Sequence, residues 1–225
     1  RGGVCRRAGS APVRDLELRR QIIDVACTLA AGGLVPNNSG NVSARTPRGF
    51  LVTPSALAYR ALQPADLAEL APDGTPIDAP RRPSSEWRMH AAIYGARPDA
   101  QAIVHTHSPR ATALACTGRG LPAFHYMIAL AGGDVRCAPY ATFGSDELAR
   151  HAVAGLEGRR ATLLANHGVI AIGGTLAAAL AVASEVENMA GQYLALLAAG
   201  LEPVVLDPAE LARVIDKFRD YGRPA

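Results

Sequence analysis

The stretch Ala102-Ile-Val-His-Thr-His-Ser108 has the pattern of a buried strand that ends in two histidines. Side chains alternate between the two faces of a strand, so His105 and His107 are expected on one face and Thr106 on the other. Imidazole nitrogens suit zinc, and a catalytic zinc usually takes three protein ligands. The pair therefore predicts a metal site that needs a third ligand, although a hydrogen-bonded surface pair has the same pattern.

The composition around this stretch is that of a globular protein, with 49% hydrophobic and 19% charged residues among 225. The net charge of +3 and the absence of a Lys/Arg block with interleaved aromatics give no indication of a nucleic-acid partner. The Ala-rich segment 174–185 ends at Glu185, and Glu187 follows two residues later. The segment therefore predicts a helix packed inside the protein and no membrane-spanning helix. We expect one domain, residues 15–225, after an N-terminal extension, residues 1–14.

The four cysteines, Cys5, Cys27, Cys116 and Cys137, have no C-x-x-C spacing. The expectation is free thiols in a reducing cytoplasm.

Upstream of the histidine pair, the spacing of apolar residues predicts a helix over 16–31 that stops at Gly32-Gly33. Residues 41–45 and 49–54 then have the pattern of a β-hairpin. Both ends of the hairpin carry small donors, which suit an oxyanion such as phosphate but are also the usual residues of turns.

The segment 83–94 predicts a helix entered through a serine cap, with Glu86 in its first turn. Ser84 and Ser85 would then stand at the positive end of the helix, where a phosphate binds well. His90 follows Glu86 by four residues on the same face and is interpreted as a packing histidine.

The remaining segments alternate between helix and strand. Residues 62–70 begin as a short helix, 121–133 place His125 and Tyr126 beside an apolar helix, and 134–140 have a strand pattern. Residues 161–172 predict strand, tight turn and strand with His167 at the turn, which supplies a third imidazole. Recurrent hairpins indicate a single-domain α/β/α sandwich with a largely antiparallel central sheet.

Several motifs together resemble the class II sugar-phosphate aldolases of the aldolase/adducin group, and among them the L-fuculose-1-phosphate aldolase branch. The resemblance covers roughly residues 15–222 and rests on Ser39-Gly-Asn-Val-Ser, Pro83-Ser-Ser-Glu, Ile103-Val-His-Thr-His, His125-Tyr-Met-Ile-Ala, Ala138-Pro-Tyr-Ala-Thr-Phe-Gly144, Ala161-Thr-Leu-Leu164 with Asn166-His-Gly168, and Lys217-Phe-Arg-Asp-Tyr-Gly222.

This resemblance implies a role for each matching position. The ligands of one Zn²⁺ per subunit would be His105, His107 and His167, and Glu86 would be the catalytic carboxylate. Tyr126 would act as an acid in the site of a neighbouring subunit, and Tyr221 would close over the cleft. The phosphate of the substrate would lie against Asn38, Asn41, Ser55, Ala56, Ser84 and Ser85.

Three positions depart from the family pattern. Asn38 stands where the phosphate loop usually has threonine, and Ser55-Ala56 replaces the usual Thr-Gly. The resemblance further implies homotetramers with four-fold symmetry and sites between subunits, acting on a small sugar phosphate.

The implied reaction is zinc-dependent cleavage of a ketose 1-phosphate, of the L-fuculose 1-phosphate type, to dihydroxyacetone phosphate and a small aldehyde such as lactaldehyde. An aldolase for 5-deoxyribulose or 5-methylthioribulose 1-phosphate is a close alternative, and a sugar-phosphate 4-epimerase or dehydratase shares the scaffold. A metal-free structural role, as in adducin heads, conflicts with three histidines and Glu86.

Overall fold

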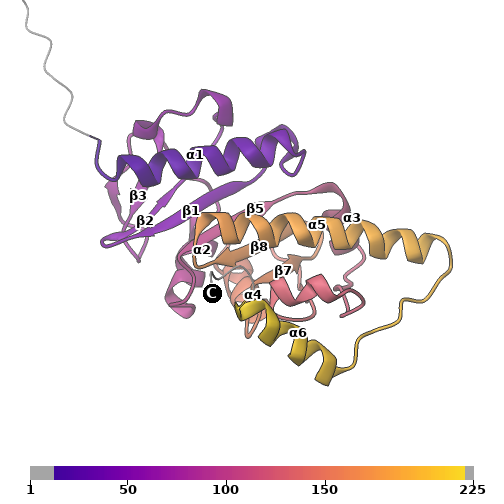
Figure 1. Ribbon diagram of the computed structural model, residues 1–225. Coiled ribbons are helices and arrows are strands. Elements are labelled where there is room, and N and C mark those ends of the chain that lie inside the picture. Colours follow the sequence, from indigo (N-terminus) through magenta and orange to yellow (C-terminus); the bar gives the residue numbers. More distant parts are fainter. Residues whose placement is uncertain (1–12, 221–225) are drawn as a thin grey trace, which may run out of the picture.

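Strand β5 (Ala102–Thr106) lies near the middle of an eight-stranded sheet in the computed structural model, which describes residues 13–220. The strand order is β4-β3-β2-β1-β5-β8-β7-β6 (Figure 1). Only β6 and β7 pair in parallel, which confirms the largely antiparallel sheet. The other strands are β1 (Asn41–Thr46), β2 (Gly49–Val52), β3 (Ala68–Leu70), β4 (Pro76–Asp78), β6 (Cys137–Ala138), β7 (Ala161–Leu164) and β8 (Gly168–Gly173).

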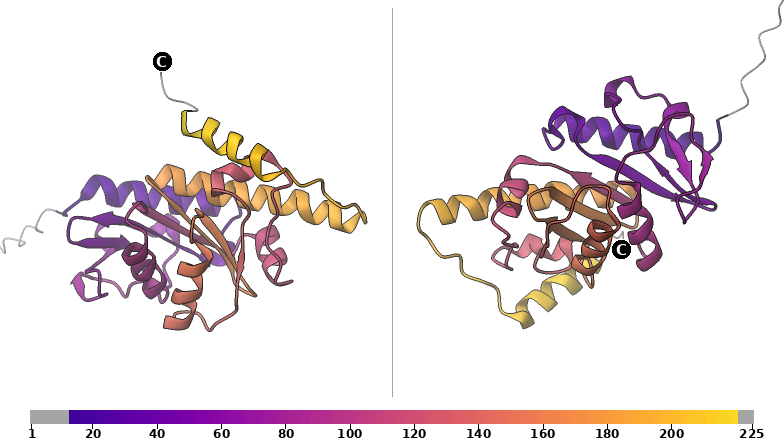
Figure 2. Two further views of the ribbon diagram at one scale, coloured as in Figure 1. Left: turned by 90° about the horizontal axis from the view of Figure 1, so that it is seen from below. Right: turned by 180° about the vertical axis from the view of Figure 1, so that it is seen from behind.

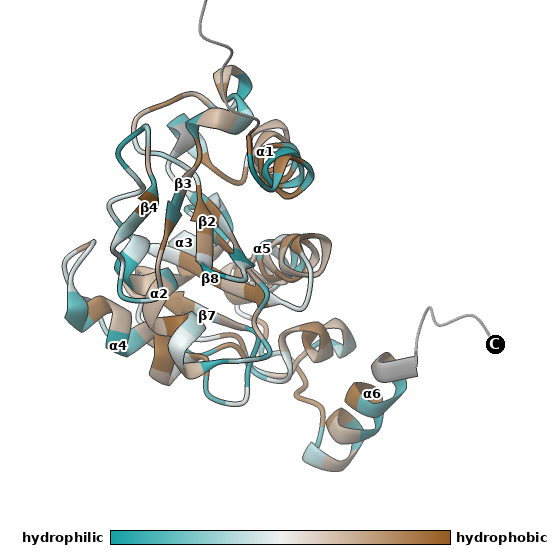
Figure 3. Ribbon diagram, turned by 90° about the vertical axis from the view of Figure 1, so that its left-hand side faces the viewer, coloured by the Kyte–Doolittle hydropathy of each residue, from teal (hydrophilic) through white to brown (hydrophobic). Residues whose placement is uncertain are grey.

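Helices cover both faces of this sheet, and the side chains of each strand alternate between two cores. Val104 of β5 belongs to the core under one group of helices, and its neighbour Ile103 belongs to the core under the other. The first group is α1 (Leu16–Ala31), α3 (Pro109–Ala115) and α5 (Leu176–Ala198), and the second is α2 (Trp87–Ala96) and α4 (Asp146–Gly155). Figures 2 and 3 show α1 and α5 on one side of the sheet, which confirms the three-layer sandwich.

Several elements match the sequence prediction closely. Helix α1 begins and ends as predicted, and the hairpin β1–β2 and the strands β7 and β8 form where expected. Helix α4 is capped by Ser145, whose hydroxyl accepts the N–H of Leu148 at 3.1 Å.

Other segments differ from the prediction. In place of a short helix from residue 62, a single 3₁₀ turn, η3 (Pro64–Asp66), leads into β3, because Leu67 is already extended with ψ 137°. The strand predicted over 134–140 is reduced to β6, since Pro139 follows at once and has no N–H for a sheet. The predicted apolar helix is the 3₁₀ helix η4 (Tyr126–Ala131).

The remaining elements are two short 3₁₀ helices, η1 (Pro36–Asn38) and η2 (Tyr59–Ala61), and the final helix α6 (Pro208–Asp220). Helix α6 packs against η4 and stands apart from the sandwich (Figure 3). Within residues 13–220, no helix combines the length and the apolar character that crossing a membrane requires.

Arg19 of α1 is fully buried and ties this helix to the edge of the sheet. Its guanidinium donates to the backbone oxygens of Arg14, Pro64 and Leu67 at 2.8–3.0 Å and pairs with Asp78 of β4 at 2.9 Å. A buried guanidinium is stable only when its donors are matched in this way. Arg19 therefore holds three separate chain segments together.

We expect Arg19→Leu to lower the free energy of unfolding by about 3 kcal/mol, because buried acceptors lose their donor and gain no water. Arg20→Leu is the matched control, since the neighbouring Arg20 is exposed on the same helix. Urea unfolding of both variants measures the difference. Equal stability of the two variants would contradict the role of Arg19.

Candidate functional site

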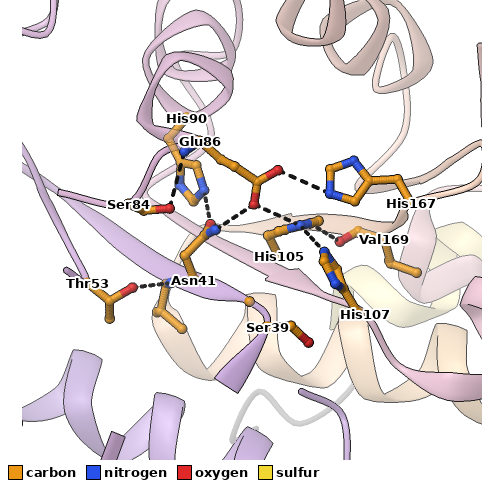
Figure 4. Close-up of polar contacts among 12 residues, drawn as sticks. Ser39, Asn41, Thr53, Ser84, Glu86, His90, His105, His107, His167 and Val169 are labelled. Atoms are coloured by element: carbon orange, nitrogen blue, oxygen red, sulfur yellow. Dashed lines mark hydrogen bonds and ion pairs between the residues drawn. The ribbon is translucent and has the colours of Figure 1, made fainter. Parts of the chain in front are cut away.

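Three imidazoles meet at one end of the sheet, as the sequence predicted. His105 is the last but one residue of β5, His107 follows the strand, and His167 sits in the turn between β7 and β8 (Figure 4). Each pair of rings has its centroids 4.9 Å apart in an edge-on arrangement, and the Nε2 atoms of His105 and His107 are 3.0 Å apart. This histidine cluster therefore points its ring nitrogens at a common centre.

The fold leaves little freedom in how the turn delivers His167. Strands β5 and β8 pair with His105 opposite Ile170, so the turn lies beside the end of β5. A Cβ on Gly168 would approach the carbonyl oxygen of Thr106 to 2.3 Å and the ring of His107 to 2.9 Å. Glycine is therefore required directly after His167.

Glu86 completes the cluster from the other side. Its Oε2 lies 3.2 Å from His105 Nε2, and its Oε1 lies 3.1 Å from His167 Nε2. The four potential ligand atoms all lie within 4.8 Å of one another. The structure corrects one detail, because Glu86 is the N-cap of α2 and does not lie in its first turn.

The predicted serine cap of this helix is also wrong. Ser84 turns its hydroxyl back to accept the N–H of Glu86 at 3.3 Å, so it steadies the residue that precedes the helix. The reason is local, since the backbone of Ser84 pairs with Thr53 and Pro83 bridges to Pro54 before the helix begins.

The donor set fits a divalent metal ion. His105 Nδ1 lies 2.8 Å from the carbonyl oxygen of Val169, which can only accept, so Nδ1 carries a proton. In the neutral ring, Nε2 then carries a lone pair, and this lone pair faces His107 and Glu86. Because Nε2 and the Glu86 carboxylate are both acceptors, a cation between them would be needed to hold them together. A carbonyl behind the imidazole is also the usual support of a metal-binding histidine. Glu86 Oε1 is buried and, apart from its contact with His167 Nε2, has no polar partner within the described residues.

The protonation states of the residues in the cluster depend on one another. Burial opposes a charge on His105, but the carboxylate of Glu86 outweighs it and raises the pKa of His105. Burial alone would raise the pKa of Glu86, yet His105 and His167 keep it below its usual value. Burial and the two neighbouring histidines lower the pKa of His107 to about 4, so this ring is neutral and free to bind at pH 7.

A cleft of about 590 Å³ opens beside the cluster and contains most of the residues predicted to bind phosphate. It is lined by Glu86, His107 and His167 together with Asn41, Ser55, Ala56, Ser84 and Ser85. Among residues 13–220, three of the four non-glycine residues with positive φ line it, namely Asn37, Ala56 and Asn166. Left-handed residues within a loop turn successive N–H groups toward one point and suit an anion. Asn38 belongs to η1, and its side chain lies outside the described part.

Asn41 lines this cleft, but its side chain is already engaged. Its Nδ2 donates to Glu86 Oε2 at 3.0 Å, and its Oδ1 contacts His90 Nε2 (Figure 4). His90 is fully buried with both ring nitrogens bonded, which confirms its interpretation as a packing histidine.

Tyr126 does not lie in the cleft of the single chain. Tyr126 is 53% exposed and lines a separate hollow with Met127 of η4 and Val214 and Phe218 of α6. Its ring stacks on Phe218 with 6.3 Å between centroids. Tyr221 lies outside the described residues.

The sequence reasoning missed other residues near the site. Ser43 and Tyr94 extend the contacts of His90 deeper into the protein. The sequence did contain a signal for these contacts, namely the spacing of polar residues. Asn41 and Ser43 are two residues apart on a strand, and His90 and Tyr94 are four residues apart on a helix. Tyr140 and Phe143 line the cleft with more than half of their surface exposed, and they were noted only within a family motif.

Comparison with known proteins agrees with this geometry. Residues 20–194 match the family described as "Class II Aldolase and Adducin N-terminal domain". The 5-methylthioribulose-1-phosphate/5-deoxyribulose-1-phosphate aldolase of Rhodospirillum rubrum is 49% identical, over 94% of this chain and 95% of its own length. The L-fuculose phosphate aldolase of Escherichia coli K12 is 44% identical, over 92% of this chain and 96% of its own length.

A solved structure of an L-fuculose 1-phosphate aldolase superimposes with a TM-score of 0.89 at 39% sequence identity. The match covers 92% of this chain and 98% of that protein. The family match spans more than half of the sequence, and both aldolase relatives align along nearly their entire length. The chain therefore belongs to the class II aldolase and adducin family and is an enzyme of its aldolase branch, a lyase.

Proposed function

We propose that this enzyme catalyses the reversible cleavage of a ketose 1-phosphate into dihydroxyacetone phosphate and a small aldehyde. The observation that supports this function best is the combination within one cleft of the Glu86 and histidine cluster with loops suited to an anion. In this arrangement the cluster of Glu86 and histidines lies next to the reacting carbons of the substrate, and the loops bind its phosphate a few ångströms away.

The zinc ligands in this proposal are His105, His107 and His167. When bound there, the metal supplies Lewis-acid stabilisation of the negative charge that develops on the substrate oxygens.

The phosphate is bound mainly by hydrogen bonds and the helix dipole. The cleft lining within the described residues includes no Lys or Arg. The N-terminus of α2, preceded by Ser84 and Ser85, faces the cleft and contributes partial positive charge. Ser55, Ala56 and Asn41 line the same hollow, so small side chains leave room for the phosphate oxygens to approach the backbone.

Glu86 is placed to move a proton at C3 of the substrate. Cleavage breaks the C3–C4 bond and leaves the electron pair on the C2–C3 fragment, which must take up a proton at C3. Because the neighbouring histidines keep the pKa of Glu86 low, its carboxylate is ionised at pH 7 and can accept a C3 proton in the synthetic direction. In cleavage, the same carboxylate returns that proton.

Tyr126 is proposed to exchange a proton with the C4 oxygen of the aldehyde in the site of a neighbouring subunit. Its half-exposed ring lines a hollow that is separate from the cleft of its own chain, with Val214 and Phe218 of α6, which supports this arrangement. The proposal thus includes a homotetramer. It also includes a cytoplasmic location, which the free thiols of Cys27, Cys116 and Cys137 support.

Two types of substrate remain as candidates. The resemblance of the motifs favours L-fuculose 1-phosphate, which releases lactaldehyde, whereas the name of the 49% identical relative favours 5-deoxyribulose or 5-methylthioribulose 1-phosphate. The exposed aromatic rings of Tyr140 and Phe143 at the cleft suit an apolar tail in either case.

An assay of triose phosphate release tests the reaction. The zinc-loaded enzyme is given L-fuculose 1-phosphate, 5-deoxyribulose 1-phosphate, 5-methylthioribulose 1-phosphate and ribulose 5-phosphate, with and without a chelator. We expect dihydroxyacetone phosphate from at least one ketose 1-phosphate, loss of activity with the chelator and recovery with zinc. If no triose phosphate is released, but ribulose 5-phosphate is epimerised or the methylthio substrate loses water, the proposed reaction is wrong and the enzyme is an epimerase or a dehydratase.

Removing one imidazole tests the metal ligands. His107→Ala should weaken zinc binding by more than the roughly 10- to 100-fold that follows loss of a group orienting a ligand. His151→Ala is the control, because His151 lies on α4 and bonds to the carbonyl of Pro139. Zinc content after dialysis distinguishes the variants. Full occupancy in His107→Ala would remove His107 from the ligand set.

Glu86→Gln separates proton transfer from metal binding. The variant keeps the shape of the side chain and should retain zinc, while turnover falls by roughly 10²- to 10⁴-fold because the amide cannot accept a proton. Zinc analysis and the triose phosphate assay are made on the same sample. Unchanged turnover would assign the proton transfer to another group.

A further inference from the structure

One face of β1 and one stripe of α2 meet in a buried row of polar side chains. Asn41 and Ser43 are two residues apart on the strand and share a face, while His90 and Tyr94 are four residues apart on the helix. These four residues, here called the α2–β1 ladder, are at most 5% exposed. Glu86 lies four residues before His90 at the end of the same stripe, so the ladder leads directly to it.

Each step of the ladder is a close contact. Tyr94 Oη lies 2.7 Å from Ser43 Oγ, and Ser43 Oγ lies 2.6 Å from His90 Nδ1. His90 Nε2 contacts Asn41 Oδ1, and Asn41 Nδ2 lies 3.0 Å from Glu86 Oε2 (Figure 4). The row is therefore continuous from Tyr94 to the carboxylate.

The direction of every hydrogen bond follows from the ionised carboxylate. Glu86 Oε2 can only accept, so the amide of Asn41 must present Nδ2 to it and turn Oδ1 to His90. Oδ1 also only accepts, so His90 Nε2 must carry a proton. With a neutral ring, Nδ1 accepts from the hydroxyl of Ser43, whose oxygen then accepts from Tyr94.

The neutral form of His90 is favoured by its surroundings. Burial and the nearby His105 lower the pKa of His90 to about 3, although the charge of Glu86 opposes them.

Arg45, two residues beyond Ser43 on β1, lies over the Tyr94 ring at 4.7 Å and donates to the Tyr94 carbonyl at 2.6 Å. The far end of the ladder is thereby anchored.

We propose that the α2–β1 ladder is a one-way chain of hydrogen bonds whose donors all point to Glu86, and that His90 is a positioning residue acting through Asn41. Of the three polar contacts that the Glu86 carboxylate makes with residues 13–220, the one from Asn41 comes from outside the histidine cluster. The ladder thus sets the orientation of the carboxylate independently of the metal. Its catalytic consequence rests on the proposed role of Glu86.

The direction of the ladder is tested on the wild-type enzyme. Nitrogen-15 NMR of the zinc-loaded protein with labelled histidine should show His90 with a protonated Nε2 and a bare Nδ1 at pH 7. His90→Gln assigns the signals. A protonated Nδ1, alone or in an imidazolium, would overturn the proposed direction.

The positioning role is tested by two substitutions of His90. His90→Leu removes the donor to Asn41 and should lower kcat roughly tenfold or more, with KM changed little and zinc content unchanged, because the carboxylate loses its alignment. His90→Gln retains an N–H donor near the position of Nε2 and should recover most of kcat. Activity of His90→Leu equal to wild type, or failure of His90→Gln to exceed His90→Leu, would overturn the role.

Thr162→Val controls for the loss of a buried polar group. Thr162 of β7 is fully buried and donates to the carbonyl of Arg136, so its substitution should reduce stability while kcat stays unchanged. A loss of kcat in Thr162→Val as large as in His90→Leu would reduce the His90 effect to one of stability and overturn the positioning role. If the wild-type enzyme cleaves none of the ketose 1-phosphates, the proposed function is wrong. The NMR measurement still tests the direction of the hydrogen bonds in the α2–β1 ladder, because it does not depend on activity.

Discussion

The pairing of β5 with both of its neighbours is the constraint on which the site depends. Its register sets Asn41 of β1 opposite His105 and Ile170 of β8 opposite the same residue. A slip of one residue would move His105 to the opposite face of the sheet, away from α2 and Glu86. Two antiparallel strand pairings, β1 with β5 and β5 with β8, therefore bring together side chains that lie far apart in the sequence. His107 and His167, which lie on loops, take their positions from this backbone geometry.

The site is assembled at some expense of stability. Buried acceptors converge around the centre of the histidine cluster, and three residues of the cleft adopt left-handed backbone conformations that each cost on the order of 1 kcal/mol. Ala56 carries the largest positive φ of the three, 59°. Structural residues such as the buried Arg19 offset these terms from a distance.

The sequence predicted most of the fold and the centre of the site, because both follow from short periodic patterns. Helix α1 and the His105 strand have clear spacing, and His167 falls in a turn between two apolar runs. The cap of α2 was predicted wrongly, since Ser84 and Glu86 compete for the same helix end and only the tertiary pairing of Ser84 with Thr53 decides between them. The contacts of Asn41 with Glu86 and His90 were equally hidden, because they depend on how a helix stripe faces a strand.

The isolated packing of α6 has a consequence for the dynamics of the enzyme. This helix follows an exposed linker and rests mainly on η4, so its backbone hydrogen bonds can open without disturbing either core of the sandwich. Its amides should exchange with solvent as a separate cooperative unit, long before those of β5 or α5. Because Phe218 covers the Tyr126 ring, each such opening uncovers the tyrosine as well.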